Sequence, residues 1–482
     1  MSLLLYLKRH SLLIAIAIVY VVADMVLTSQ DIFLLNVVPF VFLLIYLALA
    51  RIDLIYFAIV LFTPISIQFI EYYPSSSIDF NIPTEPMLFG ILILLLFRTV
   101  QKGIPDHRVL NHPVTYAILF NIFWITITSI TSTMPLVSIK FLLARIWFTA
   151  IYYWLAVMIF RKSNTNISGF IWCYTIPMVV VVVYTINRHI GYGLFDKYAA
   201  HFVMSPFFRD HTSYGAVLAM LFFAVGGIIL NSKQNILYRC ILWGIWILIT
   251  GALILSYTRA AWISVLVSIG ILGFSLMRIR FRYILLAGMA VVLYLAGQRT
   301  AIINKMERNR QISSANISEH AQSISNITTD ESNLERINRW NSAIRMFEER
   351  PVFGWGPGTY MFKYAPFQIS SEKTGISTDF GNLGNAHSEY IGPLAESGLF
   401  GSLSFLLIGI MSLLTGFRVY SKISDRRLKQ IVLGLLLGFI TYLVHGTLNN
   451  FLDTDKVSAL FWGFTAAFVS LDLSLKELDS QN

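Results

Sequence analysis

Two residues that lie beside apolar segments have side chains suited to acid–base chemistry and to anion binding. His387 lies in the sequence Asn-Ala-His-Ser-Glu-Tyr, immediately before the apolar run 391–417. A neutral imidazole can accept or deliver a proton near pH 7; the alternative role is a polar anchor at the start of a helix. Arg259 lies between two apolar runs joined by almost no loop. Its planar guanidinium suits a diphosphate, although an arginine at a helix end can also extend toward water.

Other basic residues lie near the ends of apolar runs. Arg209, Asp210 and His211 precede one such run and could bind a phosphate together with the amides at the helix start. They could equally form a solvated boundary. Arg145 lies some way into the apolar run 141–160, nearer its external end. A contact to a phosphate or a structural ion pair would explain a charge at that depth.

A polar segment between two apolar regions offers further candidates. Arg336 and Arg339 stand beside Trp340 on a predicted helix, where they could meet a sugar or a phosphate or form a solvated helix face. Tyr360 follows a glycine-rich turn and could stack on a sugar or pack inside the fold.

Near the C-terminus, several polar residues close an apolar run. His445, Asn449 and Asn450 could line a site or form a satisfied cluster at a helix end. Asp453 and Asp455 form an Asp-x-Asp pair of the kind that often holds a metal, but two carboxylates are too few ligands to define a site. The sequence therefore predicts no metal and no cofactor.

The elements that must position these residues are membrane helices. Of 482 residues, 56% are hydrophobic and 13% are charged, whereas soluble domains carry about 25% charged residues. Apolar runs of roughly 20 residues, the length that crosses a bilayer, recur about 14 times. Because backbone groups in hydrocarbon must bond internally, each run should be a helix. The predicted fold class is an all-α polytopic membrane protein with about 12–14 transmembrane helices. The predicted spans are 10–28, 33–50, 52–70, 86–98, 113–131, 141–160, 167–187, 212–231, 237–256, 258–277, 281–297, 391–417, 428–448 and 457–471.

The net charge of +10 follows a pattern that argues against a nucleic-acid partner. Lys and Arg collect at every second loop, as they do in cytoplasmic loops of membrane proteins. This pattern predicts a multi-pass membrane protein with cytoplasmic N- and C-termini. The basic groups are Lys8/Arg9, Arg98/Lys102/Arg108, Arg161/Lys162, Lys233/Arg239, Arg278/Arg280/Arg282 and Arg418/Lys422/Arg426/Arg427/Lys429.

The spans divide the chain into three regions. Residues 1–297 hold transmembrane helices 1–11, residues 298–390 form a large periplasmic loop, and residues 391–482 hold helices 12–14 and a cytoplasmic tail. Within the loop, a capping-box sequence at 332–335 predicts a helix over 333–349. A glycine-rich turn follows at 354–358. Five residues at helical spacing predict an apolar stripe that rests on another element: Leu334, Ile337, Trp340, Ile344 and Phe347.

Several of these segments, in this order, resemble the superfamily of O-antigen ligases and O-antigen polymerases, which are membrane glycosyltransferases. The resemblance covers roughly residues 200–415. At one position the chain departs from the family, which commonly has Asn after the loop histidine, where Ser388 stands here. The matching motifs are Arg209-Asp-His-Thr-Ser-Tyr-Gly, Ser256-Tyr-Thr-Arg-Ala-Ala-Trp, the segment 335–358, Ala386-His-Ser-Glu-Tyr-Ile and Glu396-Ser-Gly-Leu-Phe-Gly.

The resemblance implies a function and a set of site residues. The protein would lie in the bacterial inner (cytoplasmic) membrane with a periplasmic active site. It would transfer a glycan from an undecaprenyl diphosphate donor to an acceptor hydroxyl there, without a metal. The acceptor would be lipid A-core for a ligase or a second lipid-linked glycan for a polymerase, with membrane lipids as further partners. The alternatives are a transporter (flippase) of lipid-linked sugars and a non-catalytic component of polysaccharide assembly. We predict catalytic roles for His387 and Arg259 and substrate binding by Arg209, His211, Arg145, Arg336 and Tyr360.

Overall fold

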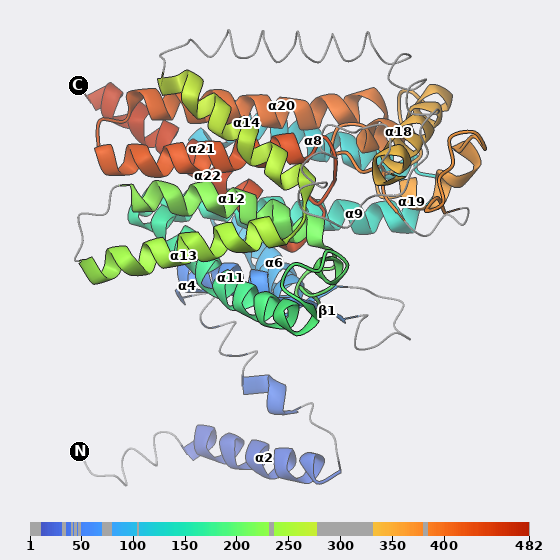
Figure 1. Ribbon diagram of the computed structural model, residues 1–482. Coiled ribbons are helices and arrows are strands. Elements are labelled where there is room, and N and C mark those ends of the chain that lie inside the picture. Colours follow the sequence, from blue (N-terminus) through green and yellow to red (C-terminus); the bar gives the residue numbers. More distant parts are fainter. Residues whose placement is uncertain are drawn as a thin grey trace. The chain divides into compact units, whose positions relative to one another are not determined.

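The structure is a computed structural model, which describes residues 11–30, 35–39, 42, 46, 50–69, 80–103, 106–230, 236–276, 331–378 and 384–481 (Figure 1). The chain forms two compact units, Met1–Ala58 and Ile59–Asn482. All of the predicted site residues belong to the second unit. The predicted span 281–297 and the predicted loop as far as residue 330 lie outside the described residues, and the predicted span 33–50 is described only in part.

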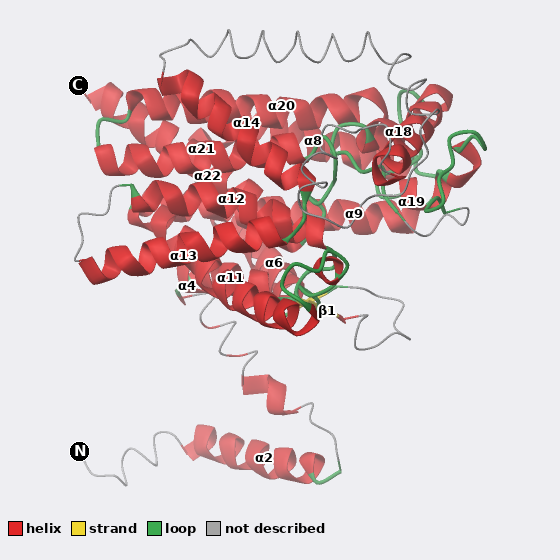
Figure 2. Ribbon diagram, viewed as in Figure 1, coloured by secondary structure: helices red, strands yellow, loops and turns green. Residues whose placement is uncertain are grey.

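Helices make up nearly all of the described structure (Figure 2). In the second unit two short strands pair antiparallel, with Ile67 opposite Ile82. In chain order the elements are α2 (Ser11–Thr28), η1 (Leu35–Val37), α4 (Ile52–Phe62), η2 (Thr63–Ile65), β1 (Ile67–Gln68), β2 (Asn81–Ile82), α6 (Thr84–Lys102), α7 (His107–Leu110), α8 (Pro113–Ile130), α9 (Pro135–Phe148), the π-helix η3 (Thr149–Leu155), α10 (Ala156–Lys162), α11 (Thr165–Tyr192), η4 (Ala199–His201), α12 (His211–Ile229), α13 (Ile236–Leu255), α14 (Arg259–Leu276), α18 (Glu331–Glu349), α19 (Tyr360–Lys363), η5 (Ala365–Phe367), α20 (Gly392–Lys422), α21 (Arg426–His445) and α22 (Asp455–Gln481).

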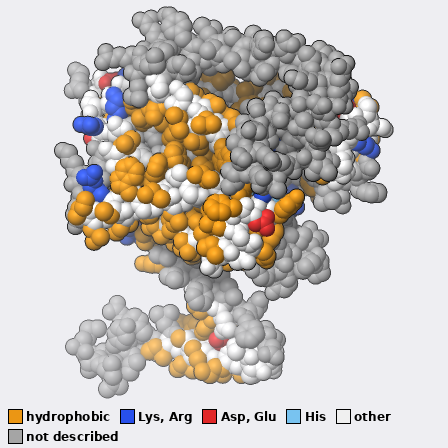
Figure 3. Space-filling view, in the orientation of Figure 1, with side chains coloured by type: hydrophobic (Ala, Val, Ile, Leu, Met, Phe, Trp, Pro, Cys, Tyr) orange, Lys and Arg blue, Asp and Glu red, His pale blue; other side chains and the backbone are white. Residues whose placement is uncertain are grey.

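The length and hydropathy of these helices confirm the predicted fold class, an all-α polytopic membrane protein. Within the described ranges, nine helical segments are long and apolar enough to cross a bilayer, and three shorter apolar helices accompany them. One span, Pro135–Lys162, joins α9, η3 and α10. On the face drawn in Figure 3, hydrophobic side chains cover most of the described helices. Such a surface suits contact with lipid tails rather than water.

The centre of the second unit is α22, in which every residue from 455 to 473 is buried. Around it, α12 and α21 cross at very short range through glycines. A Cβ atom built on Gly434 would lie only 2.4 Å from the carbonyl oxygen of Phe223, and Gly227 faces Gly434 directly. Small residues at such crossings let the backbones of membrane helices pack closely. This packing fixes the start of α12 beside the end of α21.

Charged residues gather in ion pairs at the end of the bundle where α20 stops and α21 starts, which we call the basic end. Arg161 pairs there with Asp106 and with Glu477 near the C-terminus of α22. Lys422 pairs with Asp479 at 2.8 Å. The opposite end, which we call the site end, holds the starts of α12, α14, α20 and α22 and the end of α21. There α18 and α19 lie beside the helix ends (Figure 1).

Candidate functional site

His387 lies in the loop 384–391, which leads into α20. Its backbone is in the left-handed region with φ of 50°, which costs about 1–3 kcal/mol for a residue other than glycine. Two neighbours hold this conformation. The His387 amide donates to Oδ1 of Asn385 at 3.0 Å, and Oγ of Ser388 accepts from the amides of Tyr390 and Ile391 at 3.3 Å each. Ser388, at the position where the sequence departs from the resembled family, therefore stabilises the turn that precedes α20.

Glu389 ties the loop 384–391 to the loop 446–454 between α21 and α22. Its buried Oε1 accepts from the amides of Phe451 and Leu452 at 2.8 Å each and from the hydroxyl of Tyr442 at 2.5 Å. The Glu389 amide donates to the carbonyl of Gly446 at 2.8 Å. Burial raises the pKa of Glu389, while these hydrogen bonds act in the opposite direction. The glutamate of the His-Ser-Glu motif is thus a structural anchor for the second loop of the site.

The helix α18 contacts the backbone of the loop that carries His387 and of the loop 446–454. The Trp340 indole donates to the His387 carbonyl at 3.4 Å, and Nε of Arg336 donates to the carbonyl of Leu448 at 3.3 Å. α18 occupies the region where the sequence predicts a helix over 333–349, but the predicted apolar stripe is only half-buried. The fully buried face instead carries Glu335 and Arg339, 2.7 Å apart.

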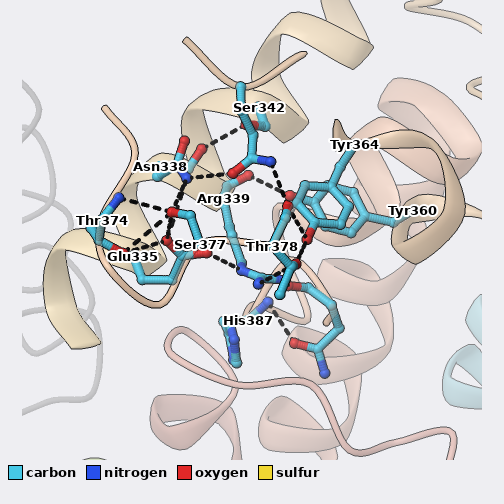
Figure 4. A network of polar contacts seen from close by, with 12 residues as sticks. Glu335, Asn338, Arg339, Ser342, Tyr360, Tyr364, Thr374, Ser377, Thr378 and His387 are labelled. Carbon is cyan, nitrogen blue, oxygen red and sulfur yellow. Dashed lines mark hydrogen bonds and ion pairs between the residues drawn. The ribbon is translucent and has the colours of Figure 1, made fainter. Parts of the chain in front are cut away.

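Residues 364–378 account for this buried polar face (Figure 4). Oε2 of Glu335 accepts from Oγ1 of Thr374 at 2.9 Å and also from Ser377. The Arg339 guanidinium lies 4.8 Å from the centre of the Tyr364 ring. Because partners satisfy both charges, the face can be buried without leaving an uncompensated ion. The most deeply buried face of α18 is therefore displaced from the predicted stripe, because this pairing does not follow apolar periodicity.

The glycine-rich turn packs against α20. The amide of Gly356 donates to the carbonyl of Glu396 at 2.8 Å, and the amide of Tyr360 donates to Oε1 of the same residue at 3.1 Å. The Tyr360 side chain is only 2% exposed, and its hydroxyl donates to the carbonyl of Arg339 at 2.8 Å. Tyr360 therefore packs inside the loop region rather than facing a space where a sugar could stack.

A cavity of about 370 Å³ lies at the site end. Its lining comes from β1, β2, the segment before α12 and the first turn of α12, α19, the loop 384–391, the loop 446–454 and the first turn of α22. Carboxylates, cations and amides alternate with aromatic rings in this lining, and none of the lining residues belongs to α18. The residues are Gln68, Asn81, Pro206, Phe207, Phe208, Arg209, Asp210, Ser213, Met361, Gly384, Asn385, His387, Asn450, Phe451, Asp453, Thr454, Asp455 and Lys456.

Two cations face this cavity from neighbouring segments. Arg209 is exposed, and in the described part of the chain it makes no hydrogen bond or ion pair. The Lys456 ammonium lies 5.6 Å from the centre of the Phe208 ring. It donates to Oγ of Ser66 at 2.7 Å and lies 3.4 Å from Oδ1 of Asp455. Arg209 is thus the cation that a bound anion can reach without breaking an existing pair.

The electrostatic surroundings keep the His387 imidazole neutral. Burial, together with the positive charges of Arg336 and Arg339, lowers the pKa of His387 to about 3, and a hydrogen bond with the Asn449 side chain acts in the opposite direction. A neutral imidazole has a nitrogen lone pair that can accept a proton. Binding of an anion in the cavity would favour the protonated form and raise this pKa.

The other predicted site residues surround the cavity without lining it. Thr258, next to Arg259, donates to the carbonyl of His211 at 2.8 Å. This contact sets the start of α14 against the start of α12. The His211 ring lies 4.1 Å from that of His201. Arg145 is 9% exposed and interacts electrostatically with the carboxylates of Glu389 and Asp453. Among the described residues these carboxylates act on Arg145 at longer range than an ion pair.

Lys456 is the cavity cation that sequence reasoning missed, and Asp453 was considered there only as a metal ligand. The carboxylate of Asp453 lies within electrostatic range of Arg145 and Arg209. That of Asp455 accepts from Ser66 at 2.6 Å. Among the residues that the structure describes, no group of three or more His, Cys, Asp or Glu side chains is placed to hold a metal ion. The position of Lys456 at the start of an apolar run was the one available signal.

The comparisons with known proteins bear on the same region. A family model described as O-antigen ligase matches residues 243–406. No curated protein matches the chain. The matched segment runs from within α13 through α14 and α18 into α20 and includes Arg259 and His387. It covers about a third of the chain and supports the predicted resemblance to the superfamily of O-antigen ligases and polymerases.

Proposed function

We propose that the protein transfers a glycan from undecaprenyl diphosphate to an acceptor hydroxyl at the periplasmic face of the inner membrane. The observation that carries the proposal is one cavity that brings together a neutral histidine and an arginine that makes no hydrogen bond or ion pair among the described residues. Arg209 and His387 reach this cavity from segments 178 positions apart in the chain (387 − 209). The family match supports the reaction class.

The donor diphosphate would bind at Arg209. Its charges suit the guanidinium fork, and the amides at the start of α12 add partial positive charge. Arg259 is proposed as a second contact, because the turn before it is bonded to the first residue of α12. These groups would also stabilise the charge that grows on the diphosphate as the sugar bond breaks.

His387 would take the proton of the acceptor hydroxyl. The acceptor oxygen forms a new bond to the anomeric carbon of the donor sugar. The bond from that carbon to the diphosphate oxygen breaks, and its electron pair leaves with the diphosphate. The proton moves from the hydroxyl to the free ring nitrogen of His387. Holding both substrates in one cavity contributes the rest of the rate by fixing their orientation.

The proposed orientation rests on where the charges lie. Arg161, Lys422 and the basic residues at the start of α21 lie at the basic end, which would face the cytoplasm by the positive-inside pattern. The cavity lies at the opposite end and would therefore open toward the periplasm. An external site fits a donor that is supplied on a lipid rather than as a nucleotide sugar.

The test combines a purified assay with a glycan profile. Purified protein in lipid nanodiscs should transfer labelled glycan from undecaprenyl diphosphate to an acceptor, and the assay should be run with lipid A-core and with a second lipid-linked glycan. In cells without the gene, loss of long chains on an unmodified core indicates a ligase, whereas capping by single repeats indicates a polymerase. Unchanged profiles together with no transfer to either acceptor would rule out the proposed reaction.

A further inference from the structure

Two buried polar residues continue from His387 into the protein. Asn449 is 2% exposed and His445 is 1% exposed, and neither lines the cavity. Nδ2 of Asn449 lies 3.2 Å from Nε2 of His445, and the Asn449 side chain lies close enough to the His387 imidazole to raise its pKa as a hydrogen-bond acceptor would. The three side chains therefore form a row from the cavity into the interior.

The donor and acceptor atoms of the Asn449 amide determine which hydrogen bonds it can make to the two histidines. An amide donates through its nitrogen and accepts through its oxygen. Because the Asn449 nitrogen faces His445, its oxygen is the atom available to an N–H of His387. An imidazole that donates from one nitrogen offers the lone pair of the other. The nitrogen that Asn449 leaves free is then the one that can accept a proton.

The backbone holds Asn449 in this place. Its amide donates to the His445 carbonyl at 3.1 Å, and the preceding carbonyl of Leu448 accepts from Arg336. Nδ1 of His445 is buried and has no hydrogen-bond partner in the described parts of the chain. An unpaired polar atom in the interior is destabilising. Nε2 is therefore the ring nitrogen through which His445 contacts Asn449.

We propose that Asn449 is a positioning residue, which holds His387 in the tautomer that accepts the acceptor's proton, and that His445 fixes the orientation of the Asn449 amide. This inference rests on the proposed function, because it assigns His387 the role of base. When His387 takes up the proton, the Asn449 oxygen continues to accept from the ring and so stabilises the imidazolium. The other charged groups around the ring are Arg336 and Arg339 on α18 and, on the walls of the cavity, Arg209, Asp210, Asp453, Asp455 and Lys456.

The first experiment measures the tautomer itself. Full-length protein labelled with ¹⁵N-histidine is reconstituted in nanodiscs, and the His387 signals are assigned by their loss in His387→Gln. We expect one dominant neutral tautomer in the wild type and a mixture of both in Asn449→Ala. Asn121→Ala is the matched control, because Asn121 is also a buried asparagine with one side-chain hydrogen bond, to Ser404 at 2.8 Å. An unchanged tautomer in Asn449→Ala overturns the inference.

The second experiment uses turnover and the nearly isosteric variant Asn449→Asp, which serves if the alanine variant fails to fold. Asn449→Ala should lower kcat about tenfold, the order expected for one orienting hydrogen bond, with the KM for donor unchanged. In Asn449→Asp a carboxylate faces the ring, which favours the imidazolium and raises the pKa of His387. The base is then lost at higher pH, so the acidic limb of kcat/KM should move up by at least about one pH unit.

Different results would contradict the role of His387 as base and the role of Asn449 as a positioning residue. If His387→Ala keeps full turnover, the assignment of the base fails whatever the tautomer spectrum shows. If His387→Ala is inactive but Asn449→Asp leaves both the tautomer and the pH profile unchanged, Asn449 is only a structural residue and the positioning role is wrong. A tautomer change in Asn449→Ala with a matching kcat loss supports the inference.

Discussion

The two ends of the helix bundle differ in what surrounds particular basic residues. At the basic end, Arg161 pairs with Asp106 and Glu477, and Lys422 pairs with Asp479. At the site end, Arg209 is exposed on a cavity and has no such partner in the described residues. Cations paired with the protein's own carboxylates serve the fold. A cation that faces a cavity without a pair is available to a ligand.

The two ends of the bundle also differ in backbone strain. Among the described residues other than glycine, Tyr257 and His387 alone have positive φ, at 50° each. Both belong to the site end, since Tyr257 lies in the turn before Arg259. Strained residues persist only where their surroundings hold them, and they gather at functional sites. The site end therefore contains two residues, Tyr257 and His387, whose backbone conformation lowers the stability of the fold. The described residues of the basic end contain none.

The largest expected effect concerns which side of the membrane each end faces. Ser371 follows the helices beside the cavity and Ser424 lies at the basic end, and both are exposed. A cysteine at Ser371 should react fully with a membrane-impermeant thiol reagent added to the periplasm, and one at Ser424 should not react. Cys173 and Cys240 are replaced first, so that only the new thiol is present. Labelling of the Ser424 position in intact cells would reverse the orientation and place the cavity in the cytoplasm.

The next effect is on the chemical step. His387→Ala should lower turnover by about 10²–10⁴-fold, the range that general acid–base help supplies. Binding of labelled undecaprenyl-diphosphate sugar should persist, because the proposed task of His387 lies at the acceptor. His107→Ala is the matched control, since His107 is exposed in the short helix α7 near the basic end. Equal losses in both variants would show that the effect is not specific to the site end.

A smaller effect is expected for donor binding at Arg209. Arg209→Ala should weaken donor binding by about 10- to 100-fold, since a charge-assisted hydrogen bond contributes about 1.5–3 kcal/mol. Arg209→Lys should recover only part of this affinity, because an ammonium cannot make two parallel hydrogen bonds. Arg161→Ala, which breaks ion pairs at the basic end, should leave donor affinity unchanged. The measurement is equilibrium binding of labelled donor to each purified variant. Unaltered affinity in Arg209→Ala would remove Arg209 from the donor site.

Much of the fold follows from sequence periodicity, because a membrane helix has to be long, apolar and internally bonded. The predicted span 391–417 begins within one residue of α20, and α18 covers the predicted helix 333–349. The prediction for the last span was too short: it ended at residue 471, whereas α22 continues to Gln481. Polar residues in its final turns pair with other helices, as Asp472 does with Arg418 at 3.4 Å. Hydropathy alone cannot detect such partners.

The residues of the candidate site could likewise be predicted only in part from the sequence. His387 and Arg209 stand out because motifs mark them, and the structure brings both to one cavity. Lys456 escaped notice because its partner Ser66 lies 390 positions away in the chain. The buried polar face of α18 likewise depends on residues such as Ser377, which lies 42 positions from Glu335. Contacts of this range are set by tertiary packing, and no local pattern records them.

The smallest effect tests whether Tyr360 belongs to the site or to the fold. Its hydroxyl donates to the carbonyl of Arg339, and its ring stacks on Tyr364 with centroids 5.1 Å apart. Tyr360→Phe keeps the ring and removes the hydroxyl, so it should lower the free energy of unfolding by about 1 kcal/mol, the contribution of one buried hydrogen bond. Turnover and KM should stay at wild-type values, because the side chain lines no part of the cavity. Thermal unfolding in nanodiscs gives the first quantity, and the transfer assay gives the second. If Tyr360→Phe unfolds like the wild type but loses turnover, the hydroxyl acts on substrate. The glycine-rich turn would then have to move toward the cavity when a glycan binds, and the division between site and scaffold at this end would need to be redrawn.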